Sequence, residues 1–328
     1  MILQIWYLLA TGLFPVAFVA AKQDYGVGFE LTLDYGVASI HFPNGSYAEV
    51  AKIEGNPTYK QRMRTADVQK DHAYIAPDTP TAISWQSFRD YLPPWLGGHN
   101  PTHDSISRML KSLKIASESY LEDSVSTAEI TVPFPISKPF FDTLRYATKS
   151  ISISIPANPA APAGKLAAIH VYDIGPGNCD YFPDPQDPAQ AFLTVEYTRS
   201  ALTALLVYEE CGVYDNIRVL HETDVGSRES THDRRAKLTT ALGVLTKMPV
   251  KCDGVVLKSL SNVVLLGESS QDQLLHDVLK DVLSKQEQSV NETTVFDQHE
   301  APLNPVFAGS LAAARLNMFR SNVTHDEV

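Results

Sequence analysis

The sequence predicts an α/β protein built from two similar lobes. The first observation is a strand–turn–strand pattern over residues 29–42, in which Leu31 and Leu33 alternate with polar residues and Gly36 supplies the turn. The second is a related segment about half a chain later. The third is the length of 328 residues, which suffices for one large bilobed domain or two ordinary ones.

The related segment repeats a pattern of five residues. Residues 31–35 read Leu-Thr-Leu-Asp-Tyr, and residues 193–197 read Leu-Thr-Val-Glu-Tyr, at an offset of 162 positions (193 − 31). Such a recurrence indicates two similarly built lobes, although coincidence between two strands also accounts for five residues. If the lobes are repeated, Thr32 and Thr194 lie in two separate, similar sheets that face one cleft.

Composition excludes several classes of protein. With 44% hydrophobic and 20% charged residues, the chain can form a globular core. The net charge of −11 argues against nucleic acid as a partner, because phosphate binding needs a basic surface. The sequence also lacks the cluster of Lys and Arg residues that a membrane-surface patch needs.

Metal sites and a disulfide scaffold are not indicated either. The three cysteines are too few for a disulfide framework, and their spacing fits no zinc pattern. His221 and His232 flank a strongly polar stretch without a His-Glu-x-x-His pattern. We therefore expect both histidines to be solvated surface residues, and no metal ligand is assigned.

The N-terminus predicts entry into the secretory pathway. Residues 1–21 are apolar and end in Val-Ala-Ala, which fits a signal peptidase site, although Lys and Arg are absent before the apolar run. An uncleaved anchor is the competing interpretation, but about twenty residues interrupted by Pro15 make a marginal span. We expect a cleaved signal peptide and no stable membrane span afterwards. Sequons at Asn44, Asn291 and Asn322 agree with this compartment.

In the first half of the mature chain, periodicity and capping residues predict alternating strands and helices. A second turn at Asn44-Gly45 leads into a strand through residue 53. The further predicted elements are a helix at 81–92, a helix at 104–122, a strand at 128–133 closed by proline, and a helix at 139–149.

The second half starts with prolines that rule out regular structure near residues 156–162. We then predict a buried strand at 166–171 and a Pro-rich linker at 181–188. The second hairpin, at 192–197 and 201–208, precedes a third strand around 218–220. A buried strand at 261–267 leads to a helix at 271–283 capped by Ser269 or Ser270, and Asn304 caps a final helix.

Several of these blocks resemble the seventy-kilodalton heat-shock chaperones. The proline-closed strand and the helix reading Leu-Arg-Tyr-Ala-Thr-Lys (144–149) resemble the first connecting segment of that family. Residues 267–271, Gly-Glu-Ser-Ser-Gln, resemble its adenosine contact, and residues 304–314 resemble its closing Pro-x-x-Ala-x-x-x-Gly-Ala-Ala helix. With the opening hairpin, these are four matches in the family's order over residues 28–316.

The resemblance implies a bilobed actin-like ATPase (ribonuclease H-like) fold with reduced outer subdomains and no peptide-binding domain. Residues 22–180 then form lobe I, residues 181–303 form lobe II, and the hinge lies near 160–188. Residues 304–320 form the closing helix of the domain, and residues 321–328 are a polar tail.

The same resemblance implies a place for ATP or ADP with magnesium. Asp34 and Gly36 in the first hairpin, and Glu196 in the second, fall where the family approaches the phosphates and the hydrated ion. The adenosine side falls on Gly267, Ser269 and Ser270. From the residues alone, Asp34 before Gly36 is favoured as a turn residue over a magnesium ligand.

Departures from the family concentrate on the phosphate path. Val37 and Ala38 replace two threonines, and residues 198–200, Thr-Arg-Ser, replace three glycines. Thr203 and Asn158 stand where the family has acids, and Gln271 replaces an arginine. Phosphoryl transfer depends on positioning and charge stabilisation, so we expect no catalytic residue and no efficient hydrolysis.

Three functional classes follow: a working ATPase, a nucleotide-binding module without hydrolysis, and an interaction protein on an inherited fold. We predict a degenerate heat-shock-type domain that acts mainly through a protein partner or client, with weak or absent ATP binding. The alternative is a functional ATP-binding, chaperone-like ATPase of the endoplasmic reticulum. The C-terminal His-Asp-Glu-Val differs by one residue from a retention signal, so both residence in that lumen and secretion remain open.

Overall fold

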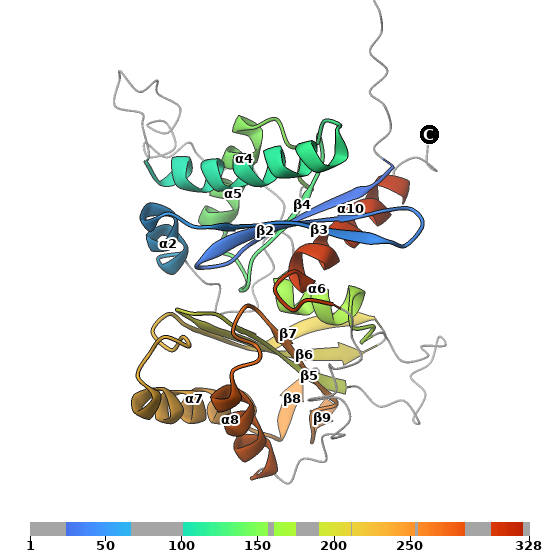
Figure 1. The fold of residues 1–328 in the computed structure, drawn as a ribbon. Helices are drawn as coiled ribbons and strands as arrows, with labels where there is room; N and C mark the ends of the chain where they lie inside the picture. The colour runs from blue at the N-terminus through green and yellow to red at the C-terminus, as the bar shows by residue number, and fades with distance from the viewer. Residues whose placement is uncertain are drawn as a thin grey trace, which may run out of the picture.

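The computed structural model describes residues 24–66, 101–156, 161–174, 190–210, 212–252, 255–285 and 303–323. These residues form a mixed α/β structure with two four-stranded sheets, which confirms the predicted α/β class (Figure 1). Among the predicted features, the segment 1–21, the helix at 81–92, the linker at 181–188 and the sequon at Asn291 lie outside the described residues.

The first sheet has the strand order β3-β2-β1-β4. Strand β1 is antiparallel to β2, β2 is antiparallel to β3, and β1 is parallel to β4. Helix α4 packs on β1, β2 and β3, and α5 packs on α4, so that these two helices form the outer layer in Figure 1. Helix α2 contacts α4 and lies beside the end of the sheet. The bounds are β1 Gly26–Leu31, β2 Tyr35–His41, β3 Tyr47–Glu54, α2 Pro57–Arg64, α4 Pro101–Leu121, β4 Glu129–Thr131 and α5 Lys138–Ser150.

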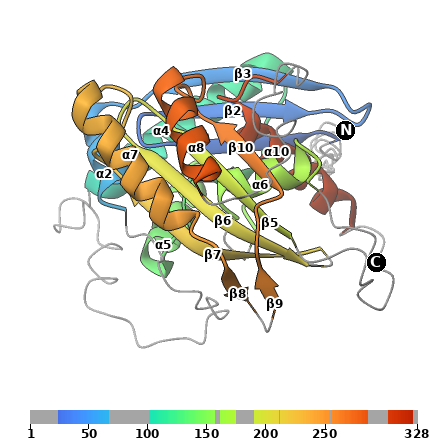
Figure 2. The same ribbon diagram turned by 90° about the horizontal axis from the view of Figure 1, so that it is seen from below.

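The second sheet, in the order β10-β5-β6-β7, repeats this pattern. Strand β5 is antiparallel to β6 and parallel to β10, and β6 is antiparallel to β7. Helices α7 and α8 pack together over its outer face (Figure 2). The bounds are β5 Gln190–Tyr197, β6 Leu202–Glu210, β7 Val213–Glu222, α7 Thr231–Leu245, β10 Asn262–Leu266 and α8 Gln273–Ser284, with a small hairpin of β8 Val250–Cys252 and β9 Val255–Leu257.

Two helices lie between the sheets, and each packs on the sheet of the other half of the chain. Helix α6 (Ala163–His170) follows the first sheet in sequence but packs on β5, β6 and β10. Helix α10 (Ala308–Val323) follows the second sheet but packs on β1, β2 and β4, and also on α6. An apolar cluster from α6, α10 and the inner face of the second sheet fills this layer (Figure 1). The exchange of helices joins the two halves through a shared core.

Glycines in β1 allow the backbone of α10 to lie directly on the strand. A Cβ atom on Gly28 would come within 2.0 Å of the Ser310 carbonyl oxygen, and one on Gly26 within 1.9 Å of the Ala314 oxygen. Because alternate residues of a strand share a face, the same face continues to Glu30. Phe29 and Leu31, on the opposite face, pack in the outer core with α4.

Several sequence predictions are confirmed, including the helices α4, α5 and α8 and the strands β4 and β10. Others are wrong. Residues 166–171 are not a strand but fall largely in α6, because Leu-Ala-Ala-Ile favours a helix once its apolar side packs between the sheets. Helix α7 was not predicted. The third strand is longer than expected, since β7 spans ten residues.

Both predicted caps in the last third also differ. Asp272, not Ser269 or Ser270, caps α8, with its Oδ1 accepting from the Leu274 N–H at 2.9 Å. Helix α10 begins at Ala308, and the Asn304 side chain instead accepts from the Val306 N–H at 3.2 Å in the preceding turn. Within the part of the chain described, no helix is long and apolar enough to cross a membrane.

Candidate functional site between the two hairpin turns

Two four-residue turns occupy equivalent positions in the two sheets. The β1–β2 turn (residues 32–35) follows the pair Leu31–Gly36, and the β5–β6 turn (residues 198–201) follows the pair Tyr197–Leu202. Each turn opens with threonine. The Thr32 N–H donates to the Tyr35 oxygen at 2.9 Å, and the Thr198 N–H donates to the Ala201 oxygen at 3.0 Å. The two hairpins therefore share one turn geometry.

The strand pairing sets the internal repeat at 166 positions (197 − 31), four more than the five-residue pattern indicated. In this register Glu30 corresponds to Glu196, and Asp34 corresponds to Ser200. Thr32 lies in the turn directly after β1, whereas Thr194 lies inside β5, so these two threonines belong to separate sheets but not to equivalent positions. The sequence signal for the structural register is Glu-apolar-Thr, at residues 30–32 and 196–198.

The two turns are bonded to each other. The Asp34 Oδ2 accepts hydrogen bonds from the Ser200 hydroxyl at 2.6 Å and from the Ser200 N–H at 3.2 Å. The Thr32 hydroxyl oxygen accepts from the Asp34 N–H at 3.2 Å, which fixes the turn that carries the carboxylate. Asp34 is buried, and its side chain thus joins one hairpin to the other. This role extends the turn-residue interpretation favoured from the sequence.

Charged side chains surround this contact. The Arg199 guanidinium pairs with Glu54 at the end of β3, at 2.6 Å, and with Glu268, directly after Gly267. Lys52 on β3 pairs with Glu268 at 2.5 Å and lies 4.2 Å from the centre of the Tyr35 ring. These ion pairs connect the first sheet with the second turn and with the loop after β10. They are partly exposed, so each contributes modestly to stability.

The prediction that Gly36 supplies the turn is wrong, because Gly36 lies in β2, pairs with Leu31 and does not have a positive φ. Its role is in packing. A Cβ atom there would come within 2.8 Å of the Met109 Sδ and 3.0 Å of Leu113 on α4. The glycine therefore admits the outer helix against β2. The structure places this close approach on the α4 side of the sheet, whereas Asp34 reaches toward the second turn.

The three residues predicted for adenosine form a loop bound to β5. Gly267 has a φ of +88°, and a Cβ there would come within 2.5 Å of the Tyr197 oxygen. The Ser269 N–H donates to the same oxygen at 3.0 Å, and its hydroxyl lies 2.8 Å from that of Ser227. Ser270 is buried, and its N–H donates to the Gly267 oxygen. The structure brings the three residues together, with their polar groups engaged within the protein.

Glu196 meets the residue that sequence reasoning missed, Glu30. The two carboxyl groups come from equivalent positions of β5 and β1, are 4% and 3% exposed, and lie close enough to influence each other's pKa. Glu30 also accepts from the Ser310 N–H of α10. Burial raises the pKa of both carboxyl groups, and the nearby negative charges raise that of Glu196 further. A carboxylate and a carboxylic acid sharing one proton fit this geometry.

A histidine continues the polar row on the second sheet. Glu196, Thr203 and His221 are successive cross-strand neighbours on β5, β6 and β7. The Thr203 Oγ1 lies 2.8 Å from the His221 Nδ1, and Phe134 packs on the imidazole with ring centres 4.6 Å apart. Burial lowers the pKa of His221 to about 4, so the ring is neutral at physiological pH. The prediction of a solvated His221 is therefore wrong.

The first predicted glycosylation site lies on an exposed turn between β2 and β3. The Asn44 Oδ1 accepts from the Ser46 N–H at 2.9 Å and from the Ser46 hydroxyl at 2.6 Å, and Gly45 has a φ of +83°. Both residues of the sequon are accessible from solvent. Asn322 falls near the C-terminal end of α10.

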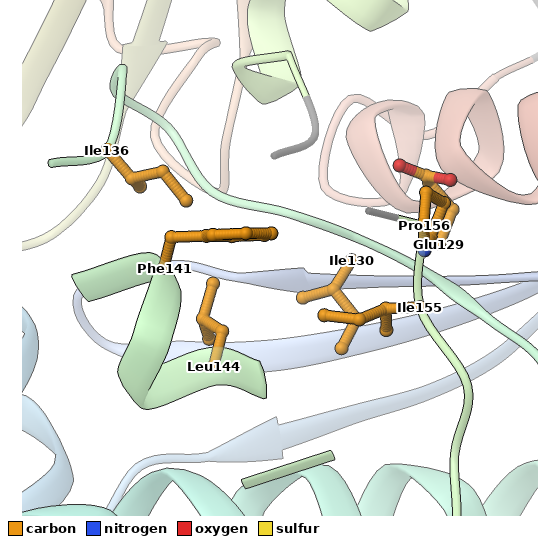
Figure 3. Close-up of a pocket in the computed structure, with 7 residues that line it drawn as sticks. All are labelled: Glu129, Ile130, Ile136, Phe141, Leu144, Ile155 and Pro156. Carbon is orange, nitrogen blue, oxygen red and sulfur yellow. The ribbon is translucent and has the colours of Figure 1, made fainter. Parts of the chain in front are cut away.

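An apolar hollow on the first sheet is separate from these groups (Figure 3). It is bounded by β4, α5 and residues 155–156, and none of the residues predicted to bind nucleotide lines it. Its one charged residue, Glu129, pairs with Arg320 of α10 at 2.8 Å. Burial, partly offset by Arg320, raises the pKa of Glu129 to about 7. The lining residues are Glu129, Ile130, Ile136, Phe141, Leu144, Ile155 and Pro156.

Among the described residues, no three His, Cys, Asp or Glu side chains are arranged to hold a metal ion. No protein-family model matches the sequence, and no curated protein is significantly similar to it.

Proposed function

We propose that this chain is a degenerate actin-like domain of the heat-shock-70 type that acts through protein contacts, with weak or absent ATP binding and no efficient hydrolysis. The observation that carries the proposal is the bonding of Asp34 to Ser200, which joins the two hairpin turns. In the resembled family the triphosphate lies between the corresponding turns. Here a carboxylate, a hydroxyl and a guanidinium hold that position.

Two features support the actin-like part of the proposal. The two sheets have the same strand order and the same mixture of parallel and antiparallel pairs. Equivalent hairpins from the two sheets meet at one place, and the polar loop after β10 lies beside them. In the resembled family, two similarly built halves surround the nucleotide, so these features support the proposal.

The chemistry of the turns supports the loss of hydrolysis. A phosphate cradle needs free backbone N–H groups and residues that let the backbone approach closely. The Ser200 N–H donates to Asp34, and the Thr198 N–H donates within its own turn. The Arg199 side chain already pairs with two carboxylates. A nucleotide would have to displace the Asp34–Ser200 contact and these ion pairs before its phosphates could bind.

The proposal is tested by calorimetric titration of the full chain with Mg-ATP. The chain is produced in cells that have a secretory pathway. We expect no saturable heat at micromolar nucleotide, no thermal shift and no phosphate release. The variant Asp34→Ala should lose stability without changing these results, and Asp224→Ala, an exposed acid on the second half, is the matched control. Micromolar affinity and turnover in the parent chain, both lost in Asp34→Ala, would favour the alternative of a working ATPase.

The partner side of the proposal has its own test. A protein that works through inherited contacts should co-purify with the same proteins whether or not Mg-ATP is present, whereas a nucleotide-gated chaperone releases clients when nucleotide is added. The proposed location is the endoplasmic reticulum lumen or the secreted fraction. The location is supported if glycosidase treatment changes the gel mobility of the parent chain and this change is smaller in Asn44→Gln. A parent chain without glycan contradicts the location.

A further inference from the structure

We infer that Glu30 and Glu196 form a proton-dependent lock between the two sheets: one shared proton holds the sheets together at the turns, and its loss releases them. This inference does not depend on the proposed function, because it concerns only the contact between the halves of the chain. It rests on the position of the two carboxyl groups, their burial and the groups that face them.

The two acids are positioned by strands of different sheets. Glu30 precedes the β1–β2 turn by two residues, and Glu196 precedes the β5–β6 turn by two residues. The contact between the two carboxyl groups therefore crosses from sheet to sheet, next to the hydrogen bond between Asp34 and Ser200. Four residues thus make a paired contact in which equivalent positions, 30 with 196 and 34 with 200, face each other.

Packing holds Glu30 in place. A Cβ atom on Gly309 would come within 2.5 Å of the Glu30 Oε2, so the backbone of α10 lies directly against the carboxyl group. The Ser310 N–H donates to the same group. The Oε2 atoms of Glu30 and Glu196 are both buried without a donor among the described residues. A proton held by the pair itself is the donor that remains.

In the described part of the chain, the other titratable groups that interact with the pair are an aspartate and two tyrosines. Asp34 comes from the first turn, Tyr35 from β2 and Tyr59 from α2, and burial raises the pKa of both tyrosines. The Tyr59 hydroxyl donates to the Thr32 oxygen at 2.8 Å. Among the described residues, no Lys, Arg or His shifts the pKa of either carboxyl group. A second negative charge on the pair would therefore remain uncompensated.

The direction of the pH effect follows from this environment. A carboxyl whose pKa is raised in the closed form stabilises that form fully below its ordinary pKa, and the stabilisation is lost as pH rises through the raised value. Two ionised carboxylates close together in a buried site repel strongly. Because they belong to different sheets, separating the sheets relieves the repulsion. The lock is closed in acid and at neutrality, and it opens at alkaline pH.

The variant Glu196→Gln tests this inference. A glutamine keeps the shape and donates its amide hydrogen to Glu30, but it has no proton to lose. The thermal midpoint of the full parent chain should fall as pH rises from about 5 to about 9.5, and Glu196→Gln should fall less. We expect the midpoint of the variant to exceed that of the parent by at least about 2 °C at the alkaline end and not at the acid end.

Hydrogen exchange separates opening of the lock from general destabilisation. After correction for the intrinsic pH dependence of exchange, peptides covering residues 198–201 should lose protection at alkaline pH in the parent but not in Glu196→Gln. Peptides of α8, which packs on the outer face, should retain protection in both proteins. Uniform loss across both peptides would contradict a local release.

Glu129→Gln is the matched control. Glu129 is also a buried acid with a raised pKa, but it pairs with Arg320 rather than with a second acid across the sheets. This variant should keep the alkaline loss of the parent above about pH 8. Parallel pH profiles for the parent and Glu196→Gln would overturn the inference. If Glu196→Gln does not accumulate in the cell, Glu30→Gln replaces it in the same test, with the donor and the acceptor exchanged. Failure of both variants to fold at any pH would also contradict the inference.

Discussion

One face of β1 makes two kinds of contact with α10: close backbone packing at glycines and a polar contact at a glutamate. Gly26 and Gly28 let the α10 backbone approach, and Glu30 then meets the same helix through Gly309 and Ser310. The sequence does not distinguish these roles, because a glycine in a strand indicates close approach without naming the partner. Glu30 looks like a solvent-facing residue of a half-buried strand until the second sheet is placed opposite it.

Gly28→Ala tests the close approach at residue scale. Its methyl group would come within 2.0 Å of the Ser310 oxygen and 2.3 Å of the Ala314 nitrogen, both of which are helix backbone and cannot rotate away. We expect a loss of at least about 3 kcal/mol in the free energy of unfolding measured with urea. Gly243→Ala on α7 is the control, since a Cβ there meets nothing within 4 Å. It should stabilise by about 0.5–1 kcal/mol, and equal losses at both positions would contradict the packing argument.

At the scale of elements, the sequence predicts strongly periodic segments well and ambiguous ones poorly. Helices α4, α5 and α8 were predicted because their apolar residues recur at helical spacing. The run at 166–171 is predicted as a strand but is mostly helical, because a short apolar stretch fits a buried strand and a buried helix equally. Helix α7 is not predicted because it lacks a clear apolar face and its N-terminal half is polar. It packs on β7, the strand that directly precedes it, and on α8, which follows later in the chain.

Capping of α8 gives the prediction at this scale. The Asp272 carboxylate accepts from the Leu274 and Leu275 N–H groups and pairs with Arg234 at 3.1 Å, so it fixes the helix start and its neighbour α7 together. Asp272→Ala should lower the free energy of unfolding by about 1–2 kcal/mol. Ser269→Ala, which removes only the hydroxyl contact with Ser227, should cost less than about 1 kcal/mol. If Ser269→Ala lowered the free energy of unfolding more than Asp272→Ala does, the result would favour Ser269, the residue predicted from the sequence, as the cap of α8.

For the whole molecule, the sequence indicates a repeat, with coincidence as the alternative, and places the repeat in the wrong register. A match by residue type favoured an offset of 162, whereas the pairing of strands gives 166, because the hairpin turn rather than the apolar pattern fixes equivalence. As a result, Asp34 was placed with Glu196, and the structural pair is Glu30 with Glu196. The exchange of α6 and α10 could not be predicted at all, since contacts between distant segments leave no local periodic signal.

That exchange predicts how the molecule unfolds. Neither sheet carries its own inner helix, so the described halves share one apolar layer and should unfold in one transition. Urea-dependent hydrogen exchange should give coincident midpoints for Ala38 in β2 and Leu205 in β6. Gly28→Ala, on the first sheet, and Leu279→Ala, in the outer core of the second, should each move both midpoints together. Leu279→Ala should lower the free energy of unfolding by about 2–4 kcal/mol. If Gly28→Ala moved the midpoint of β2 and left that of β6 unchanged, the two sheets would be independent units, and the shared inner layer would not couple them.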